Sequence, residues 1–308
     1  MNPIVSIITP TFNRATLLPR TWHSIARQSE TRFEWVIVDD GSQDATLSVI
    51  EAFCDPRIHL IRQENLGCNA ARMRGERESS APFVLFLDSD DELYDCETLA
   101  SMIKSLEEAP SDVGVVAFAA LTPEGGSGAS RMENAEMILG YEDILYGQKI
   151  RGEVLRLFRR KALEGSHFQE AVLGWEALRY FEIARQHRFL LIDRPGLIYH
   201  MNHGGNLTSA SATIQRASSM TQGYAILFAE HGPILAKGPA GILGEHLFHA
   251  ALNCAMASQT KDAIRYSLSS LKNQGPIANN LVLIASLFLP KTLRNWLFIR
   301  RSKARGVL

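Results

Sequence analysis

The chain has 308 residues, of which 46% are hydrophobic and 21% are charged, and its formal net charge is −1. This composition is that of an ordinary globular protein, with enough apolar material for one large domain or two. The balanced charge argues against a protein that binds polyanions over its whole surface. The four cysteines have no CxxC spacing, which argues against a zinc knuckle, a thioredoxin-like motif and a secreted disulfide framework. Reduced thiols are expected.

The first residues contain no basic stretch followed by a long apolar one, so no signal peptide is expected. No run of about 18 apolar residues is present, and the longest candidate covers only residues 281–289. We therefore expect a cytoplasmic protein without a membrane span.

The first 120 residues alternate short apolar runs with amphipathic segments. A continuous apolar run predicts a strand that is buried on both faces, and strict alternation of strand and helix predicts parallel βαβ units. The predicted strands cover residues 4–9, 35–38, 58–61, 83–87 and 113–119. The predicted helices between them cover residues 17–28, 44–53, 67–78 and 96–108.

The pattern is less regular after residue 120. Residues 122–130 are rich in Gly, Ser and Pro and predict a loop. The later predictions are a strand at 154–158, a helix at 174–186, a strand at 189–192, and only helices from about residue 213. We expect an α/β domain over residues 1–210, with halves at about 1–120 and 121–210, and a helical region over 211–308.

Polar residues follow three of the predicted strands, in segments 9–14, 39–42 and 88–91. Ligands of open α/β sheets bind beyond the carboxyl ends of the strands, so these segments predict a binding site at one sheet edge. No GxGxxG follows the first strand and no GxxxxGK[ST] occurs in the chain. Their absence argues against a dinucleotide-binding Rossmann domain and a P-loop.

The sequence Asp88-Ser89-Asp90-Asp91 places three carboxylates within four residues. They repel one another unless a cation neutralises them, and hard oxygen ligands suit Mg²⁺ or Mn²⁺. If the strand continues, Asp88 and Asp90 share one face. The alternative is a solvated turn in which Asp91 caps the next helix.

The sequence Asp39-Asp40-Gly41-Ser42 also has two interpretations. It can be a structural turn, or one of its carboxylates can accept hydrogen bonds from a nucleobase or ribose.

Segments 5–14, 38–44, 65–72 and 86–91 together resemble the inverting glycosyltransferases of family 2 in order and spacing. The resemblance is specific over residues 4–92, diffuse to about 208 and absent beyond. It implies a GT-A fold, which is an α/β fold with a Rossmann-like, mixed and mostly parallel sheet flanked by helices; here a C-terminal all-helical extension follows. Bacterial polysaccharide biosynthesis is the family-level expectation.

The resemblance also implies site residues. Asp88 and Asp90 would form the DxD motif and hold a divalent cation, Mn²⁺ or Mg²⁺. Asp39 would contact the base, uracil in a UDP-sugar, and Arg72 would lie near the base or the diphosphate. The residues implied in nucleotide-sugar binding are Thr9, Pro10, Thr11, Asn13, Arg14, Asp39, Asp40, Arg72, Asp88 and Ser89.

A general base follows on a later helix in this family, in a Glu-Asp pair. Here Trp175 and Glu176 occupy the corresponding positions, so Glu176 is the predicted base and the pair is incomplete. Glu170 and Glu182 are competing candidates, and an ordinary exposed residue is the alternative for Glu176. In the loop at 199–208, we predict that His203 approaches the metal or diphosphate.

These residues predict a direct displacement in which the base takes the proton of an acceptor hydroxyl and the anomeric configuration inverts. The expected acceptor is a glycan or a lipid-linked glycan. One alternative is a nucleotidyltransferase, which would release pyrophosphate. Another is a non-catalytic membrane-associated adaptor that has kept the fold, and the incomplete Glu-Asp pair is its best support.

The C-terminal residues 246–308 contain nine basic residues and one acid, Asp262. Basic side chains mix with apolar ones over residues 281–305, a pattern typical of contact with an anionic membrane surface. We therefore expect peripheral contact at the inner face of the cytoplasmic membrane. A helical cap with a solvated basic face is the alternative, and nucleic acid is not expected because no recognition motif is present.

Overall fold

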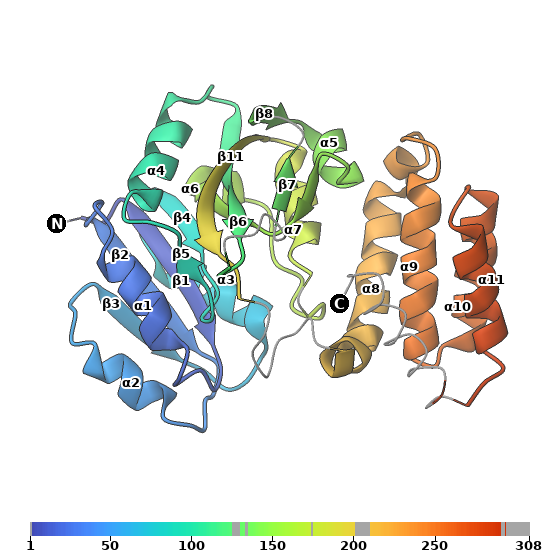
Figure 1. Ribbon diagram of the computed structural model, residues 1–308, viewed down its shortest axis with the longest axis horizontal. Helices are drawn as coiled ribbons and strands as arrows, with labels where there is room; N and C mark the ends of the chain where they lie inside the picture. Colours follow the sequence, from blue (N-terminus) through green and yellow to red (C-terminus); the bar gives the residue numbers. More distant parts are fainter. Residues whose placement is uncertain are drawn as a thin grey trace. The chain divides into compact units, whose positions relative to one another are not determined.

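The computed structural model describes residues 2–124, 130–132, 135–173, 175–200, 210–290 and 293. It divides into a sheet unit, residues 1–170 with 179–201, and a helical unit, residues 171–178 with 202–308. Figure 1 shows the strands in the first unit and helices α8 to α11 in the second. The predicted half at 1–120 therefore falls in the sheet unit, whereas residues 171–178 and 202–210 of the half at 121–210 fall in the helical unit.

The sheet unit contains a mixed sheet in which nine strands are described. Their order is β3-β2-β1-β4-β10-β6-β11-β5, and β8 also pairs with β11. The strands are β1 (Val5–Thr11), β2 (Phe33–Asp39), β3 (Ile58–Arg62), β4 (Phe83–Phe86), β5 (Glu92–Leu93), β6 (Val113–Leu121), β8 (Glu136–Leu139), β10 (Val154–Arg159) and β11 (Arg188–Ile198).

The predicted mixed sheet flanked by helices is confirmed. Strands β1, β2, β3 and β4 pair in parallel, as does β6 with β11. Strand β10 runs antiparallel to β4 and β6, and β5 and β8 run antiparallel to β11. Strand β10 thus enters the middle of the sheet against the direction of both neighbours. A separate antiparallel pair joins β7 (Ser130–Met132) and β9 (Ile150–Gly152).

Helices cover both faces of the sheet because its strands are apolar on both sides. Strands β1 and β2 are buried along their whole length. One face packs on α1 (Leu18–Ala26), α2 (Thr46–Ala52) and α4 (Thr98–Glu108). The other packs on α3 (Cys68–Glu78), α5 (Tyr141–Tyr146), α6 (Arg160–Leu163) and α7 (Ala177–Ala184). This arrangement brings the carboxyl ends of β1, β2 and β4 to one edge.

A glycine sets how closely α3 approaches the sheet. A Cβ atom at Gly75 would lie 2.5 Å from Cγ2 of Ile8 on β1. Only glycine therefore fits at this position without a shift of helix or strand. The close approach fixes the height of the neighbouring turns of α3 above the carboxyl ends of the strands.

Most predicted elements are present, with ends that differ by a few residues. The short elements β5, β7, β8, β9, α5 and α6 were not predicted, because runs this short carry no readable periodicity. Part of the predicted loop at 122–130, residues 125–129, lies outside the described residues.

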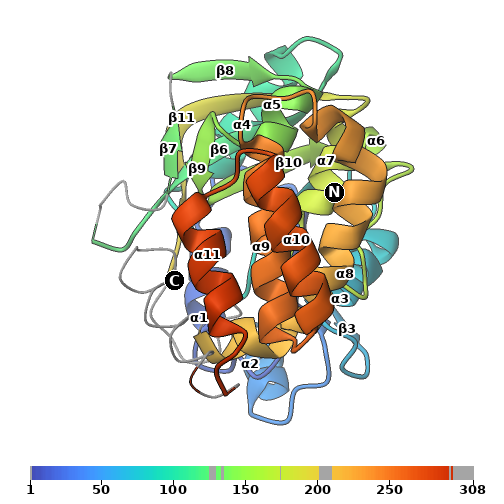
Figure 2. The same ribbon diagram turned by 90° about the vertical axis from the view of Figure 1, so that its right-hand side faces the viewer.

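The helical unit contains α8 (Ala210–Leu235), α9 (Ile242–Met256), α10 (Thr260–Lys272) and α11 (Ile277–Ser286). Figure 2 shows α9, α10 and α11 side by side. Their shared core is small and includes Ala251, Cys254, Ala263 and Leu283. Among the described helices, none has the length and apolar character needed to cross a membrane.

Candidate functional site

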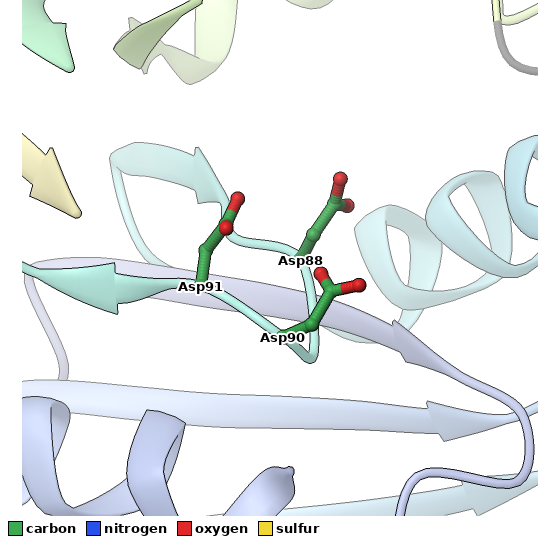
Figure 3. Close-up of side chains that lie close together, drawn as sticks. All are labelled: Asp88, Asp90 and Asp91. Atoms are coloured by element: carbon green, nitrogen blue, oxygen red, sulfur yellow. The ribbon is translucent and has the colours of Figure 1, made fainter. Parts of the chain in front are cut away.

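Three carboxylates meet in the turn that follows β4. Ligand oxygens of Asp88, Asp90 and Asp91 lie within 4.8 Å of one another, and Figure 3 shows them pointing to the same side of the turn. The strand ends at Phe86, so a turn and not strand alternation brings Asp88 and Asp90 together. Asp91 is only 5% exposed, whereas the Asp88 side chain is 49% exposed. The cluster thus runs from the protein interior to solvent.

Asp91 does not cap the next helix, contrary to the alternative considered from the sequence. Helix α4 begins at Thr98, and the Oδ1 atom of Asp91 instead accepts the backbone N–H of His200 at 3.2 Å. His200 is the second residue after β11, which pairs with β5 next to the acidic turn. The third carboxylate is therefore built into the sheet edge.

Helix α1 holds the backbone of the acidic turn. The Thr21 hydroxyl lies 2.8 Å from the Asp91 carbonyl and 3.1 Å from the Ser89 carbonyl, to which it can donate its proton. The guanidinium of Arg20 donates to the Asp90 carbonyl. With its backbone oxygens occupied in this way, the turn presents its carboxylates in a fixed arrangement.

The charge balance of the cluster favours a cation. Burial, and then the neighbouring carboxylates of Asp88 and Asp90, hold the pKa of Asp91 well above its ordinary value. Two cationic side chains approach from outside the turn: Arg72 Nη2 lies 2.6 Å from Asp88 Oδ1, and Arg14 Nε lies 4.0 Å from Asp90 Oδ2. The three oxygen ligands and their mutual repulsion fit Mg²⁺ or Mn²⁺.

The ends of β1 and β2 present two unsatisfied polar atoms. Thr11 and Asp39 are register partners on these parallel strands. Thr11 Oγ1 and Asp39 Oδ2 are buried, and neither has a hydrogen-bond partner within the part of the chain that the structure describes. The other oxygen, Asp39 Oδ1, accepts the Ser42 N–H at 3.3 Å. Buried polar atoms without partners are costly, so both are candidates for contact with a ligand.

Two residues implied in nucleotide binding have partners within the fold, and their binding roles stay predictions. Thr9 is fully buried, and its hydroxyl oxygen accepts the indole N–H of Trp35 at 2.9 Å. Asn13 adopts a left-handed conformation with φ of 53°, and its Oδ1 accepts the Gln43 N–H at 2.8 Å. These bonds give Thr9 a role in the sheet and give Asn13 a role in joining the loops after β1 and β2.

Asp40 is also committed to the fold. Its Oδ1 accepts hydrogen bonds from Gln63 Nε2 at 2.8 Å and Leu66 N–H at 2.9 Å, and its Oδ2 accepts Gly67 N–H at 2.8 Å. Gly67 directly precedes α3, the helix that carries Arg72. Asp40 therefore helps to hold the start of α3, and its role in nucleotide-sugar binding stays a prediction. Pro10 is buried within β1 and Ser89 within the acidic turn.

A buried ion pair and an aromatic ring beside α3 were not predicted from the sequence. Arg179 is 1% exposed and forms two bonds to the Glu76 carboxylate, at 2.6 and 2.9 Å. The Phe168 ring lies 4.6 Å from the Arg179 guanidinium carbon and 5.8 Å from that of Arg72. Glu76 is one turn after Arg72, so this network positions α3 behind the acidic turn. Nothing in the local sequence pairs these residues.

Neither the predicted histidine, His203, nor the predicted base, Glu176, is tested by the structure. His203 lies outside the described residues. The Nε2 atom of His200, the other histidine of this segment, lies 2.7 Å from Glu92 Oε1, and its backbone N–H donates to Asp91. Glu176 lies at the start of α7, in the segment 171–178 that belongs to the helical unit, so its role as the base stays a prediction.

The residue before Glu176 explains the departure from a Glu-Asp pair. The Trp175 ring packs on Tyr224 with ring centroids 4.6 Å apart, and a Cβ at Gly223 would lie 2.6 Å from it. Trp175 is thus a packing residue of the helical unit.

Three arginines on β10 and at the start of α6 contact other parts of the sheet unit. Arg160 Nε donates to the carbonyl of Ala81, which precedes β4, at 2.5 Å. Arg159 Nε donates to the Val113 carbonyl at 3.1 Å. Arg156 packs over the Tyr180 ring at 4.4 Å. The side chain of Arg151 is outside the described residues.

Comparison with known proteins matches these features to one family. The profile of "Glycosyl transferase family 2" matches residues 6–165, which is more than half of the chain. A Campylobacter jejuni protein named GalNAc(5)-diNAcBac-PP-undecaprenol beta-1,3-glucosyltransferase is 30% identical over 198 residues, covering 61% of this chain and 62% of that protein. The chain spans less than two thirds of the length of the first curated relatives it matches, 45% to 62%.

Solved structures share the fold. S. aureus TarS 1–349 in complex with UDP-GlcNAc aligns with a TM-score of 0.64 at 19% identity, covering 99% of this chain and 92% of that one. The mannosyltransferase PcManGT from Pyrobaculum calidifontis, in complex with GDP-Man and Mn²⁺, aligns with a TM-score of 0.58 at 22% identity, covering 98% and 85%. With its acidic turn, its strand order and this match over more than half its length, the chain belongs to glycosyl transferase family 2 and has the GT-A fold.

Proposed function

We propose that the protein is a metal-dependent, inverting glycosyltransferase that moves a sugar from a nucleoside diphosphate sugar to an acceptor hydroxyl. The observation that carries the proposal is the acidic turn: three carboxylates lie within 4.8 Å at the end of a buried strand, with Arg72 bonded to Asp88. At the ends of the neighbouring strands, Asp39 Oδ2 and Thr11 Oγ1 have no hydrogen-bond partner among the residues that the structure describes.

The donor would bind along this edge with its base on the Asp39 side. The N3–H of uracil is a donor that can satisfy Asp39 Oδ2, and Thr11 Oγ1 can bond to a base or ribose atom. The relative TarS in complex with UDP-GlcNAc supports a nucleotide-sugar donor, and we propose a UDP-sugar. PcManGT is in complex with GDP-Man, so GDP-sugars belong in the same test.

The diphosphate would lie by the acidic turn. A divalent cation held by Asp88, Asp90 and Asp91 would neutralise charge on the departing nucleoside diphosphate, and PcManGT in complex with Mn²⁺ supports this choice. Arg72 and Arg14, which approach the same carboxylates, would then bond to phosphate oxygens. His203, in the segment that follows β11 in the sequence, is proposed to approach the metal or the diphosphate.

Glu176 is the proposed base. It would remove the proton from the acceptor hydroxyl as that oxygen attacks the anomeric carbon and the bond to the diphosphate breaks, which inverts the configuration. Such a base contributes on the order of 10²- to 10⁴-fold to the rate. Glu170 and Glu182 are the alternatives. The Oε2 atom of Glu182 accepts a hydrogen bond from the His167 N–H at 3.3 Å.

The proposed acceptor is a glycan or a lipid-linked glycan. The name of the Campylobacter relative specifies an undecaprenol-linked acceptor, which supports the second choice. Such an acceptor would place the reaction at the inner face of the cytoplasmic membrane, where the basic C-terminal region is proposed to contribute contact.

The test is release of nucleoside diphosphate from UDP- and GDP-sugars with Mn²⁺, comparing wild type with Asp90→Asn. We expect the variant to lose at least about 100-fold in rate, as for loss of charge stabilisation at a transition state. Asp193→Asn, an exposed acid on β11, is the matched control and should be unchanged. Unaltered activity in Asp90→Asn overturns the metal assignment. Pyrophosphate release would instead identify a nucleotidyltransferase, and no release with any donor would favour the adaptor.

A further inference from the structure

Helix α11 carries an apolar face that no described part of the chain covers. Ile277 is 67% exposed, Leu281 is 57% exposed, and Phe288, in the turn after the helix, is 85% exposed. Leu281 follows Ile277 by four residues, so the two lie on one face of the helix. Val282 widens this face. Isolated exposed apolar residues are ordinary, but a contiguous face of large ones indicates an interaction surface.

The orientation of α11 is fixed by its opposite face. Asn280, Leu283 and Ser286 are buried there. Asn280 Nδ2 donates to Ser270 Oγ at 2.9 Å, and Ser270 Oγ donates to the Gly244 carbonyl at 2.6 Å. A rotation that buried Leu281 would break this buried chain of hydrogen bonds and expose Leu283. The helix therefore presents its apolar face outward as part of its folded arrangement.

Charge is distributed around this face in a particular way. Residues 277–290 contain no charged side chain. Lys272 precedes the helix, and the following sequence, residues 291–308, contains six basic residues and no acid. An uncharged apolar segment with cations on both sides in the sequence is complementary to a surface that is apolar beneath and negative on top. A protein partner with a plain hydrophobic groove would not require the cations.

We propose that the exposed face of α11, formed by Ile277, Leu281, Val282 and Phe288, docks on the surface of a lipid bilayer that contains anionic lipids. A helix of ten residues is about 15 Å long, half the thickness of the hydrocarbon core, so it lies in the interface and does not cross it. The inference identifies the surface used in the proposed membrane contact and in that respect rests on the proposed function, but its test is independent of sugar transfer.

The experiment is flotation of the full chain with vesicles of phosphatidylcholine alone or of an equal mixture with phosphatidylglycerol. The wild type should bind the mixed vesicles at least about tenfold more tightly than the neutral ones, with loss of binding in high salt. Leu281→Ser combined with Phe288→Ser should reduce binding to mixed vesicles by roughly tenfold or more. Ile138→Ser on β8, an apolar side chain 39% exposed in the sheet unit, is the matched control and should bind like the wild type.

Thermal melts of the variants check folding, and sedimentation velocity without vesicles checks self-association. Wild type that does not bind mixed vesicles, or a double variant that binds as well as the control, overturns the proposal. A wild-type dimer that becomes monomeric in the double variant also overturns it, because a second copy then covers the face. Nucleoside diphosphate release measured in the same samples without lipid reports separately on the proposed enzyme.

Discussion

Arg72 on α3 donates a 2.6 Å hydrogen bond to Oδ1 of Asp88 in the acidic turn after β4. The carboxylate expected to bind a cation is therefore already paired with a cationic side chain. A divalent ion that binds Asp88 must compete with this arginine, whereas a diphosphate offers the arginine a new partner.

Arg72→Ala should consequently bind Mn²⁺ alone more tightly than the wild type, by about two- to fivefold, which corresponds to the free energy of a partly exposed ion pair. The same variant should bind UDP in the presence of Mn²⁺ more weakly, by roughly tenfold, since a charge-assisted bond to phosphate is lost. Isothermal titration calorimetry measures both. Arg72→Lys keeps the charge, so its affinities for Mn²⁺ and for UDP should lie between those of the wild type and Arg72→Ala. Weaker binding of Mn²⁺ alone by Arg72→Ala would contradict competition between Arg72 and the metal ion for Asp88.

Asp91→Asn should stabilise the metal-free protein at neutral pH. Burial raises the pKa of Asp91 in the folded state above its ordinary value of 3.8, so the folded protein binds this proton more readily than the unfolded chain. The stabilising effect of that proton is complete below pH 3.8 and is lost as the pH rises through the elevated pKa. The advantage of the Asp91→Asn variant should thus vanish toward about pH 4, in melts with EDTA. Added Mn²⁺ should raise the Tm of the wild type and not of the variant; equal melts at neutral pH would contradict the assignment.

Asp39→Asn and Asp40→Asn should affect different properties although the residues are adjacent: the first ligand binding, the second stability. The Asp39→Asn side chain would keep the acceptor for Ser42 N–H but replace the unsatisfied Oδ2 by a donor, so UDP binding should fall by about 10- to 100-fold with little change in Tm. Asp40 accepts three hydrogen bonds, so its variant should lose about 1–3 kcal/mol of unfolding free energy. UDP titration and chemical denaturation measure the two. If Asp39→Asn binds UDP as tightly as the wild type, Asp39 is not part of the donor site.

His246 on α9 should make the protein sensitive to mild acid. Burial, and then the neighbouring His249, lower the pKa of His246 to about 4. The unfolded chain therefore binds a proton near pH 6.5 that the folded protein does not, so stability is present above pH 6.5 and is lost as the pH falls toward 4. Between about pH 7 and pH 5 the loss should be about 1 to 2 kcal/mol. His246→Asn should reduce this loss in denaturation at the two pH values, and His23→Asn, an exposed histidine on α1, should not.

Gly244→Ala should destabilise the helical unit. A Cβ atom there would lie 2.4 Å from the Asn273 carbonyl oxygen and from the Gly275 nitrogen, both backbone atoms that cannot move aside cheaply. We expect a loss of about 1–3 kcal/mol. Gly232→Ala is the matched control, because its Cβ would have only Phe228 Cβ within 4.0 Å and its helix should gain up to about 1 kcal/mol. Denaturation curves that order the two variants the other way would contradict the packing.

Local patterns in the sequence were sufficient to predict the alternating strands and helices of residues 4–119, the acidic turn and the helical C-terminal region. Each depends on periodicity or on neighbours within a few residues. Chain order and spacing were also sufficient for the family. The short strands β5 and β8 were not predictable, because they exist through pairing with β11, which is distant in sequence.

What only the tertiary structure decided is which polar side chains already have partners. Thr9 and Thr11 are two residues apart on β1, yet one accepts the Trp35 indole and the other is left without a described partner. Asp91 and His200 meet only because β11 returns beside the acidic turn. Periodicity reports which face a residue occupies, whereas burial and hydrogen-bond partners depend on segments that pack from far along the chain, and these determine whether a side chain supports the fold or remains available to a ligand.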